Sequence, residues 1–142
     1  MTFNKIREDV NVDCIKEFKP KENTEDIFTR ALKSNKITDD DLKSLWELGR
    51  KGYNSKKEIC QRKGLSVDKL SNINIDEIEK KYKRIKQFKT KSRRCYFYCK
   101  FRFMKNAGKV WDSLVIRDSH KTFFKSDSFT KENLIVLEIR LL

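Results

Sequence analysis

The chain contains a single histidine in 142 residues and has no long apolar segment. Histidine is the side chain that exchanges a proton most readily near neutral pH, so His120 alone leaves little room for acid–base catalysis. No apolar run approaches the roughly 18 residues that a membrane-spanning helix needs, and residues 1–13 lack the apolar core of a secretory signal. We therefore predict a protein that is not an enzyme, has no membrane partner and works in the cytoplasm or host-cell interior.

Cysteine is also scarce, and its spacing does not suit a metal site. The four cysteines lie at positions 14, 60, 95 and 99. Structural zinc sites usually combine two closely spaced ligand pairs. Cys95 and Cys99 are one loose pair in a segment with strand-like periodicity, where their side chains are too far apart to share a metal. We predict reduced, structural cysteines without a disulfide framework, and no metal or cofactor.

Apolar residues are frequent enough for a folded core. Hydrophobic residues make up 37% of the chain, which is below the usual value of about 45–50%. Ten phenylalanines nevertheless favour a packed interior over disorder. The length indicates one domain, or one small domain with an appended element.

The positive charge is concentrated in the middle of the chain. Residues 49–109 carry 20 lysines and arginines against 5 acidic residues. Residues 1–48 have a balance of −2, and residues 110–142 are neutral. A charge that served only solubility would be spread over the chain. The concentrated block predicts a local positive potential that attracts polyanions.

Residues 23–90 carry helix signals. Acidic residues after Thr24 suit the positive end of a helix dipole, and Thr38 opens a capping box that leucines follow at helical spacing. Ser55 and Asn74 open two further boxes. The segment after the last box has one apolar face and one lysine-rich face, as expected of a surface helix.

After Lys91 the period of the pattern changes to two, which is typical of strands. Alternate cysteines and phenylalanines of residues 95–104 are predicted to face a core. The other face carries Tyr96, Tyr98, Lys100 and Arg102. This face either belongs to an ordinary amphipathic strand or stacks on bases and pairs with phosphates. Further strands are predicted at 110–118 and 134–141, although Thr130 would also suit a helix start.

The segment 55–73, SKKEICQRKGLSVDKLSNI, has the pattern of two short helices joined by a glycine turn. Cys60 is a small residue where a second helix would cross the first, and Gly64 would supply a positive φ in the turn. Apolar contacts would come from Leu65, Leu70 and Ile73. This segment resembles the helix-turn-helix superfamily of DNA-binding proteins. The resemblance implies a recognition helix over residues 66–72 that faces a major groove.

The resemblance and the charge together predict sequence-dependent binding of double-stranded DNA. The base-reading candidates are Ser66, Asp68, Lys69, Ser71 and Asn72. The phosphate-binding candidates are Arg50, Lys51, Lys56, Lys57, Arg62, Lys80, Lys83, Arg84, Arg93 and Arg94. The expected role is a small transcriptional regulator of a phage or mobile element that acts as a homodimer on repeated half-sites.

The expected fold class is α+β, with an N-terminal helical helix-turn-helix bundle followed by a small antiparallel β-rich C-terminal unit. Residues 1–22 are predicted to form an arm or short element. Residues 23–90 form the helical helix-turn-helix domain in this interpretation, and residues 91–142 form a β-rich unit for dimerisation or docking.

Three alternatives remain open. An RNA-binding module would use the basic and aromatic strand 96–102. A small phage-type inhibitor or adaptor would bind a nucleic-acid-handling protein complex through the basic block. A metal-dependent nuclease would use carboxylates near the last strands; its candidates are Asp112, Asp118 and Glu138 with Arg140, although charges on the outer faces of strands explain this set equally well.

Overall fold

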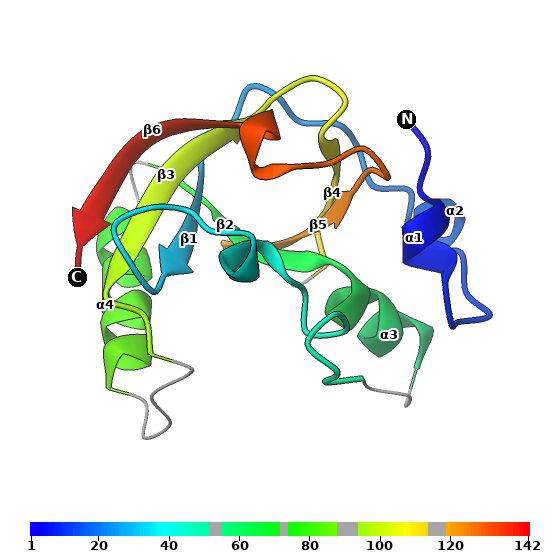
Figure 1. Ribbon diagram of the computed structural model, residues 1–142, viewed down its shortest axis with the longest axis horizontal. Coiled ribbons are helices and arrows are strands. Elements are labelled where there is room, and N and C mark those ends of the chain that lie inside the picture. Colours follow the sequence, from blue (N-terminus) through cyan, green and yellow to red (C-terminus); the bar gives the residue numbers. More distant parts are fainter. Residues whose placement is uncertain (52–54, 72–73, 88–93, 114–118) are drawn as a thin grey trace.

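The computed structural model describes residues 1–51, 55–71, 74–87, 94–113 and 119–142. Its centre is one antiparallel sheet of six strands (Figure 1). In chain order the strands are β1 (Phe28–Leu32), β2 (Leu65–Lys69), β3 (Phe97–Phe103), β4 (Gly108–Trp111), β5 (His120–Lys125) and β6 (Leu134–Leu141). The spatial order is β4-β5-β2-β1-β3-β6, so β4 and β6 are the two edge strands of the described sheet.

The helices are short and lie between the strands in sequence. Within the described residues they are α1 (Asn4–Arg7), α2 (Cys14–Phe18), α3 (Lys56–Lys63) and α4 (Ile75–Lys86), with 3-10 turns η1 (Asp40–Leu42) and η3 (Lys131–Asn133). The predicted α+β class with an N-terminal helical bundle is therefore wrong, because the fold is mostly β. Each described helix is too short or too polar to cross a lipid bilayer.

The segment after Thr24, predicted as a helix, is instead the central strand β1. Phe28 lies opposite Lys69 of β2 and opposite Phe101 of β3. Phe28 and Leu32 are both fully buried. A spacing of four residues places two side chains on one face of a helix and also on one face of a strand. The partners on both sides of β1 decide between the two, and neither is close in sequence.

The predicted recognition helix is also a strand. β2 lies between β1 and β5, and Asp68 is the direct partner of His120. Strand alternation turns Leu65 and Val67 into the core. Residues 66–69 therefore cannot present one continuous outer face, and the second helix of the motif is wrong.

Several other predicted elements are confirmed. The first helix of the motif is α3, which begins after Ser55; the Ser55 hydroxyl accepts a hydrogen bond from the N–H of Glu58. α4, β3 and β6 also form where they are expected. The capping contacts of Thr38 with Asp41 form, but they close only η1. The helix expected after them, at residues 42–48, is a series of turns instead.

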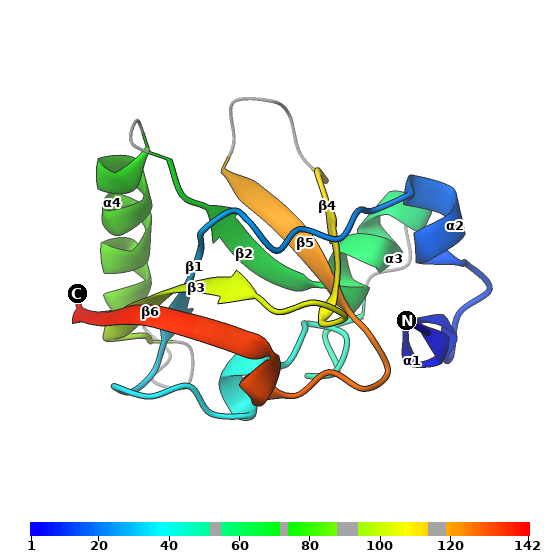
Figure 2. The same ribbon diagram turned by 90° about the horizontal axis from the view of Figure 1, so that it is seen from above.

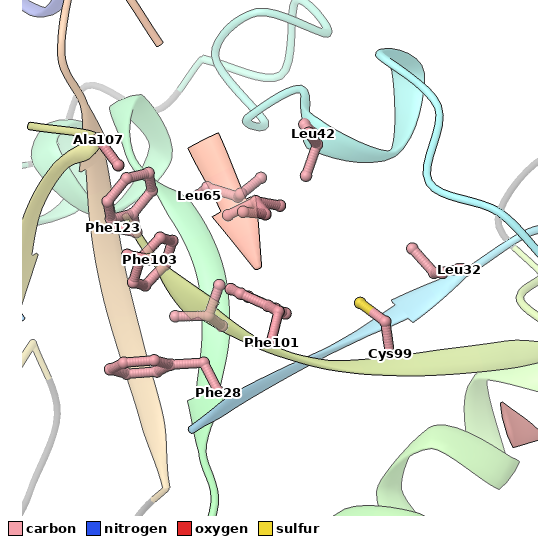
Figure 3. Close-up of a cluster of buried hydrophobic side chains, with 11 residues drawn as sticks. Phe28, Leu32, Leu42, Leu65, Cys99, Phe101, Phe103, Ala107 and Phe123 are labelled. Carbon is pink, nitrogen blue, oxygen red and sulfur yellow. The ribbon is translucent and has the colours of Figure 1, made fainter. Parts of the chain in front are cut away.

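The sheet curls around its inner face (Figures 1 and 2). Phe103 of β3 and Phe123 of β5 are separated by two intervening strands, yet their rings stack with centroids 3.9 Å apart. This contact is possible only because the sheet bends strongly. Phe28, Leu65 and Phe101 pack in the same cluster (Figure 3).

Two smaller apolar clusters lie under the longer helices. α4 places Ile78 and Tyr82 against Tyr98 of β3. α3 contributes Cys60 to a second cluster, which contains Phe124 of β5 and the N-terminal helices. Figure 1 shows that α3 and α4 lie on the same side of the sheet, with η1 between them.

The prediction that the cysteines are reduced is wrong for one pair. Cys14 of α2 and Cys60 of α3 form a disulfide between positions 46 residues apart, and both are fully buried. Cys95 and Cys99 are free thiols, as predicted. Burial raises the pKa of the Cys99 thiol to about 12, so this thiol stays protonated. The disulfide pair meets only because the N-terminal helices dock against α3, which no spacing in the sequence reveals.

The predicted positive φ at Gly64 is wrong, since its φ is −88°. This position needs glycine for space instead: an added Cβ would lie 2.2 Å from Cγ2 of Thr122 and 3.2 Å from the carbonyl oxygen of Phe123. We expect Gly64→Ala to lower the free energy of unfolding by about 1–3 kcal/mol through overpacking. Urea titration checks this, with the exposed Lys57→Ala in α3 as the control. Equal stability of wild type and Gly64→Ala would contradict the close approach.

Candidate functional site

A basic cleft opens where β1 and β2 separate. The two strands pair only over Phe28 and Thr29 with Asp68 and Lys69, and Figure 3 shows them diverging beyond Phe28. The cleft has a volume of about 550 Å³, within the range of small-molecule sites. Its walls come from β1, the η1 region, β2, α4 and the residues before β3. Five basic side chains line it: Arg30, Lys33, Lys43, Arg50 and Lys81.

Arg30 lies at the point of separation. Its Nη1 donates to the carbonyl of Ser66 at 2.6 Å, and its Nε donates to the carbonyl of Asp41 at 2.7 Å. Burial lowers the pKa of the Arg30 guanidinium, but arginine stays charged in proteins. Within the part of the chain that the structure describes, Arg30 forms no ion pair with a carboxylate. The guanidinium therefore brings a positive charge to the cleft that carbonyl dipoles hold in place.

Asp68 is the buried carboxylate of the cleft and is only 4% exposed. It accepts hydrogen bonds from the Tyr82 hydroxyl at 2.6 Å and from Lys81 Nζ at 2.9 Å. The Ser119 hydroxyl donates to it at 2.8 Å. Burial alone would raise the pKa of Asp68, but these donors outweigh burial and the pKa lies below its usual range. The network joins α4 to β2 and to the residue before β5, and it holds Lys81 at the cleft wall.

Tyr82 completes this network from α4. Its hydroxyl oxygen also lies 2.8 Å from the hydroxyl of Thr29 on β1. Burial, together with the negative charge of Asp68, raises the pKa of Tyr82 well above its usual range. The phenol is therefore neutral and acts as a hydrogen-bond donor to Asp68, which fixes the position of α4 relative to the cleft.

The rim of the cleft combines positive charge with exposed apolar surface. Lys33, Lys43 and Arg50 are exposed to solvent. Leu45 and Leu48, in the turns after η1, are 39% and 53% exposed. A ligand that carries both negative groups and a flat apolar ring would match this combination.

The base-reading candidates do not share one surface, because alternate residues of a strand point to opposite faces. Ser66 and Asp68 line the cleft, but Asp68 is occupied by its three donors. Lys69 forms an ion pair with a carboxylate ahead of β1. Ser71 is exposed between β2 and α4, and Asn72 lies outside the described residues.

Some phosphate-binding candidates border the cleft. Arg50 lines it, and Arg84 lies one turn of α4 from the cleft residue Lys81. Lys80 and Lys83 are exposed farther around the same helix. These side chains extend the positive surface from the cleft along α4.

The other phosphate-binding candidates lie elsewhere. Those on or near α3 are Lys51, Lys56, Lys57 and Arg62. Within this group Lys51 lies over the Trp46 ring, while Lys56 and Arg62 form ion pairs with glutamates. Arg94 is half-buried ahead of β3, and Arg93 lies outside the described residues.

The predicted base-stacking face is wrong at Tyr98. Tyr98 is 1% exposed beneath α4, and its hydroxyl donates to Glu79 of that helix at 2.7 Å. Burial raises the pKa of Tyr98 to about 12. Tyr96 is exposed, while Lys100 pairs with a carboxylate of β6 and Arg102 donates to a carbonyl ahead of β1. Because α4 covers this face, the two tyrosines do not form one stacking platform.

Sequence reasoning missed Arg30, Lys33 and Lys43 as site residues. They lie in the first third of the chain, whose net charge is negative, so the charge distribution directed attention elsewhere. One signal was present: Arg30 interrupts the apolar segment FTRAL, and a charge inside a buried strand needs a specific partner.

The carboxylates considered for a metal-dependent nuclease are not brought together. Asp112 follows the edge strand β4 and pairs with Lys121. Glu138 and Arg140 lie in β6, at the opposite edge of the sheet. Asp118 lies outside the described residues. No cluster of three or more metal-binding side chains occurs among the residues that the structure describes.

Comparison of the chain with models of protein families, with curated proteins and with solved structures finds no match in any of the three. The helix-turn-helix resemblance is not tested by these comparisons. The cleft is therefore interpreted from its own residues.

Proposed function

We propose that this protein binds single-stranded nucleic acid through the cleft between β1, β2 and α4. The observation that carries the proposal is the Arg30 guanidinium, which two carbonyls hold in the cleft. A carbonyl dipole fixes a guanidinium without neutralising it, so its charge remains available to a phosphate oxygen. Lys81, held by Asp68, is a second cation at the same wall.

The size and lining of the cleft favour one nucleotide unit of a flexible strand. A volume of about 550 Å³ accommodates a base with its sugar and phosphate, whereas a double helix is too wide to enter. Leu45 and Leu48 offer apolar contacts for a base. The exposed cations of α4 would contact neighbouring phosphates, as positively charged grooves do in single-strand binding proteins. Reading of duplex DNA by residues 66–72 has less support, since 66–69 are part of a strand.

The cytoplasmic location remains a prediction. A disulfide such as Cys14–Cys60 is typical of oxidising compartments and rare in the cytosol. The redox state of these two cysteines in protein isolated from its natural source tests the location directly. Two free thiols there would support the cytoplasm, whereas a disulfide would contradict it.

The first test of binding is a triple variant of the exposed rim, Lys33→Ala with Lys43→Ala and Arg50→Ala. We expect the affinity for a short mixed-sequence single strand to fall at least about tenfold. Each lost phosphate contact on a single strand removes about 0.7 from the salt dependence of the logarithm of affinity, so three lost contacts remove about 2. Fluorescence anisotropy with labelled RNA, DNA and duplex probes at several salt concentrations measures both quantities.

The matched control removes three exposed lysines away from the cleft: Lys16→Ala with Lys105→Ala and Lys131→Ala. It changes the net charge equally and is expected to retain most of the affinity. Equal losses in both triple variants would show that only net charge matters and would overturn the cleft as the site. Tighter binding of the duplex would favour duplex recognition instead. No binding to any of the probes would favour the adaptor alternative.

A further inference from the structure

The edge strand β6 presents an unusually apolar surface to solvent. Ile135, Val136 and Leu137 are 44–47% exposed, and Leu141 is 71% exposed. β6 is eight residues long and pairs with β3 along one side only among the described strands. The opposite edge differs, because Lys21 covers β4 by pairing with Val110. A long apolar edge strand without a cover is a template for pairing with another strand.

The backbone of β6 is free to pair at its C-terminal half. The N–H of Leu142 donates to the carbonyl of Tyr96, so the main-chain groups of residue 142 point toward the β3 side. These groups alternate in direction along an antiparallel strand. The N–H and C=O groups of Ile139 and Leu141 therefore point away from β3, toward the open edge.

The side chains of this half are complementary to a second copy of themselves. When two β6 strands run antiparallel about Ile139, Glu138 lies opposite Arg140 of the second copy, and the reverse pair forms by symmetry. Leu137 then lies opposite the second copy's Leu141. A register centred on Glu138 would instead place two glutamates against each other, which is unfavourable. Charge thus selects one register of a symmetric pair.

We propose that two copies of this chain associate through β6, antiparallel about Ile139, to form a dimer with one continuous sheet. The occupant is a second copy because the two-fold register pairs opposite charges and apolar residues at once. The association covers the apolar edge that would otherwise recruit unrelated strands. It does not depend on what the cleft binds.

The test is sedimentation equilibrium of the full chain over a wide range of protein concentrations. Wild type is expected to show a reversible monomer–dimer equilibrium. Ile139→Pro removes an N–H that points to the open edge, so the monomer should fold while dimerisation weakens at least about tenfold. Glu138→Arg places like charges opposite each other and should also weaken the dimer. The double change Glu138→Arg with Arg140→Glu restores opposite pairs and should restore dimerisation.

Glu132→Arg makes the same charge change in the exposed η3 and serves as the control. Circular dichroism confirms that each variant is folded. A wild type that stays monomeric at all concentrations would overturn the proposal. A dimer that persists in Ile139→Pro and Glu138→Arg would use another surface and would overturn it equally. Failure of the charge swap to restore the dimer would reject the register.

Discussion

Loss of the Cys14–Cys60 disulfide is expected to lower the free energy of unfolding by about 4 kcal/mol. The bond joins positions 46 residues apart, and the entropy of closing a loop of that length in the unfolded chain gives this value. Small domains are stable by only about 5–15 kcal/mol in total. The bond is thus expected to contribute a large share of the stability of this protein.

The structure indicates where the loss would act. The disulfide ties α2 to α3, and it lies in the cluster that holds the N-terminal helices against β5. Cys95 and Cys99 lie outside this cluster. We expect protection of the α1–α2 backbone against hydrogen exchange to fall more than that of β3, which pairs with strands on both sides.

The measurement is urea unfolding of wild type with and without a reductant, alongside Cys14→Ala with Cys60→Ala. The reductant should destabilise wild type and leave the double variant unchanged, because that variant has no disulfide to lose. A wild type whose stability is the same in both conditions would contradict the prediction. Intact-mass analysis after alkylation establishes how many thiols are free in each sample.

Asp68→Ala is expected to lower the free energy of unfolding by about 3 kcal/mol. Removing one member of a buried ion pair leaves its partners without their acceptor, which commonly costs about 3–5 kcal/mol. Here the hydroxyls of Tyr82 and Ser119 and the ammonium of Lys81 would lose their bonds. Lys81 is 39% exposed and regains water, so the low end of that range applies.

Stability should also depend on pH through Asp68. The pKa of Asp68 is lower in the folded protein than in the unfolded chain, where it is about 3.9. The unfolded state therefore binds the proton more tightly, and the contribution of Asp68 is fully present above about pH 4. It is lost as pH falls through the lower, folded pKa. Asp68→Asn cannot titrate, so its stability relative to wild type should improve over this acid range.

The control for Asp68→Ala is Asp112→Ala, which removes a carboxylate from an exposed pair with Lys121. Asp112 is 80% exposed, and such surface pairs contribute about 1 kcal/mol or less. Chemical denaturation from neutral to acid pH compares all four proteins. Equal destabilisation by Asp68→Ala and Asp112→Ala would show that burial of the network adds nothing.

Elements that carry their own local signals were predicted correctly. α3 has a serine cap within the chain segment itself, and the alternation of α4 and β3 matches one period clearly. β1 and β2 carry ambiguous patterns of five residues, which suit a helix turn or a strand. Their identity depends on β3 and β5, which lie about 50 or more residues away in sequence.

The cleft was less predictable than the secondary structure. Its cations come from both the neutral N-terminal third and the basic block, so neither segment alone indicates it. Arg30 and Lys81 are 51 positions apart and meet because β1 leaves β2 after two residue pairs. Asp68 seemed to be a base-reading residue because its role as an anchor for α4 depends on Tyr82 and Ser119.

The sequence by itself determined the net charge, the scarcity of histidine, the amphipathic helix α4 and the alternating strand β3. These follow from composition and from periods that a short window contains. Only the tertiary structure decided that 65–69 is a strand, that Cys14 bonds to Cys60, and that Arg30 enters a cleft. Each of these depends on groups distant in sequence, whose approach is set by the packing of the whole curled sheet.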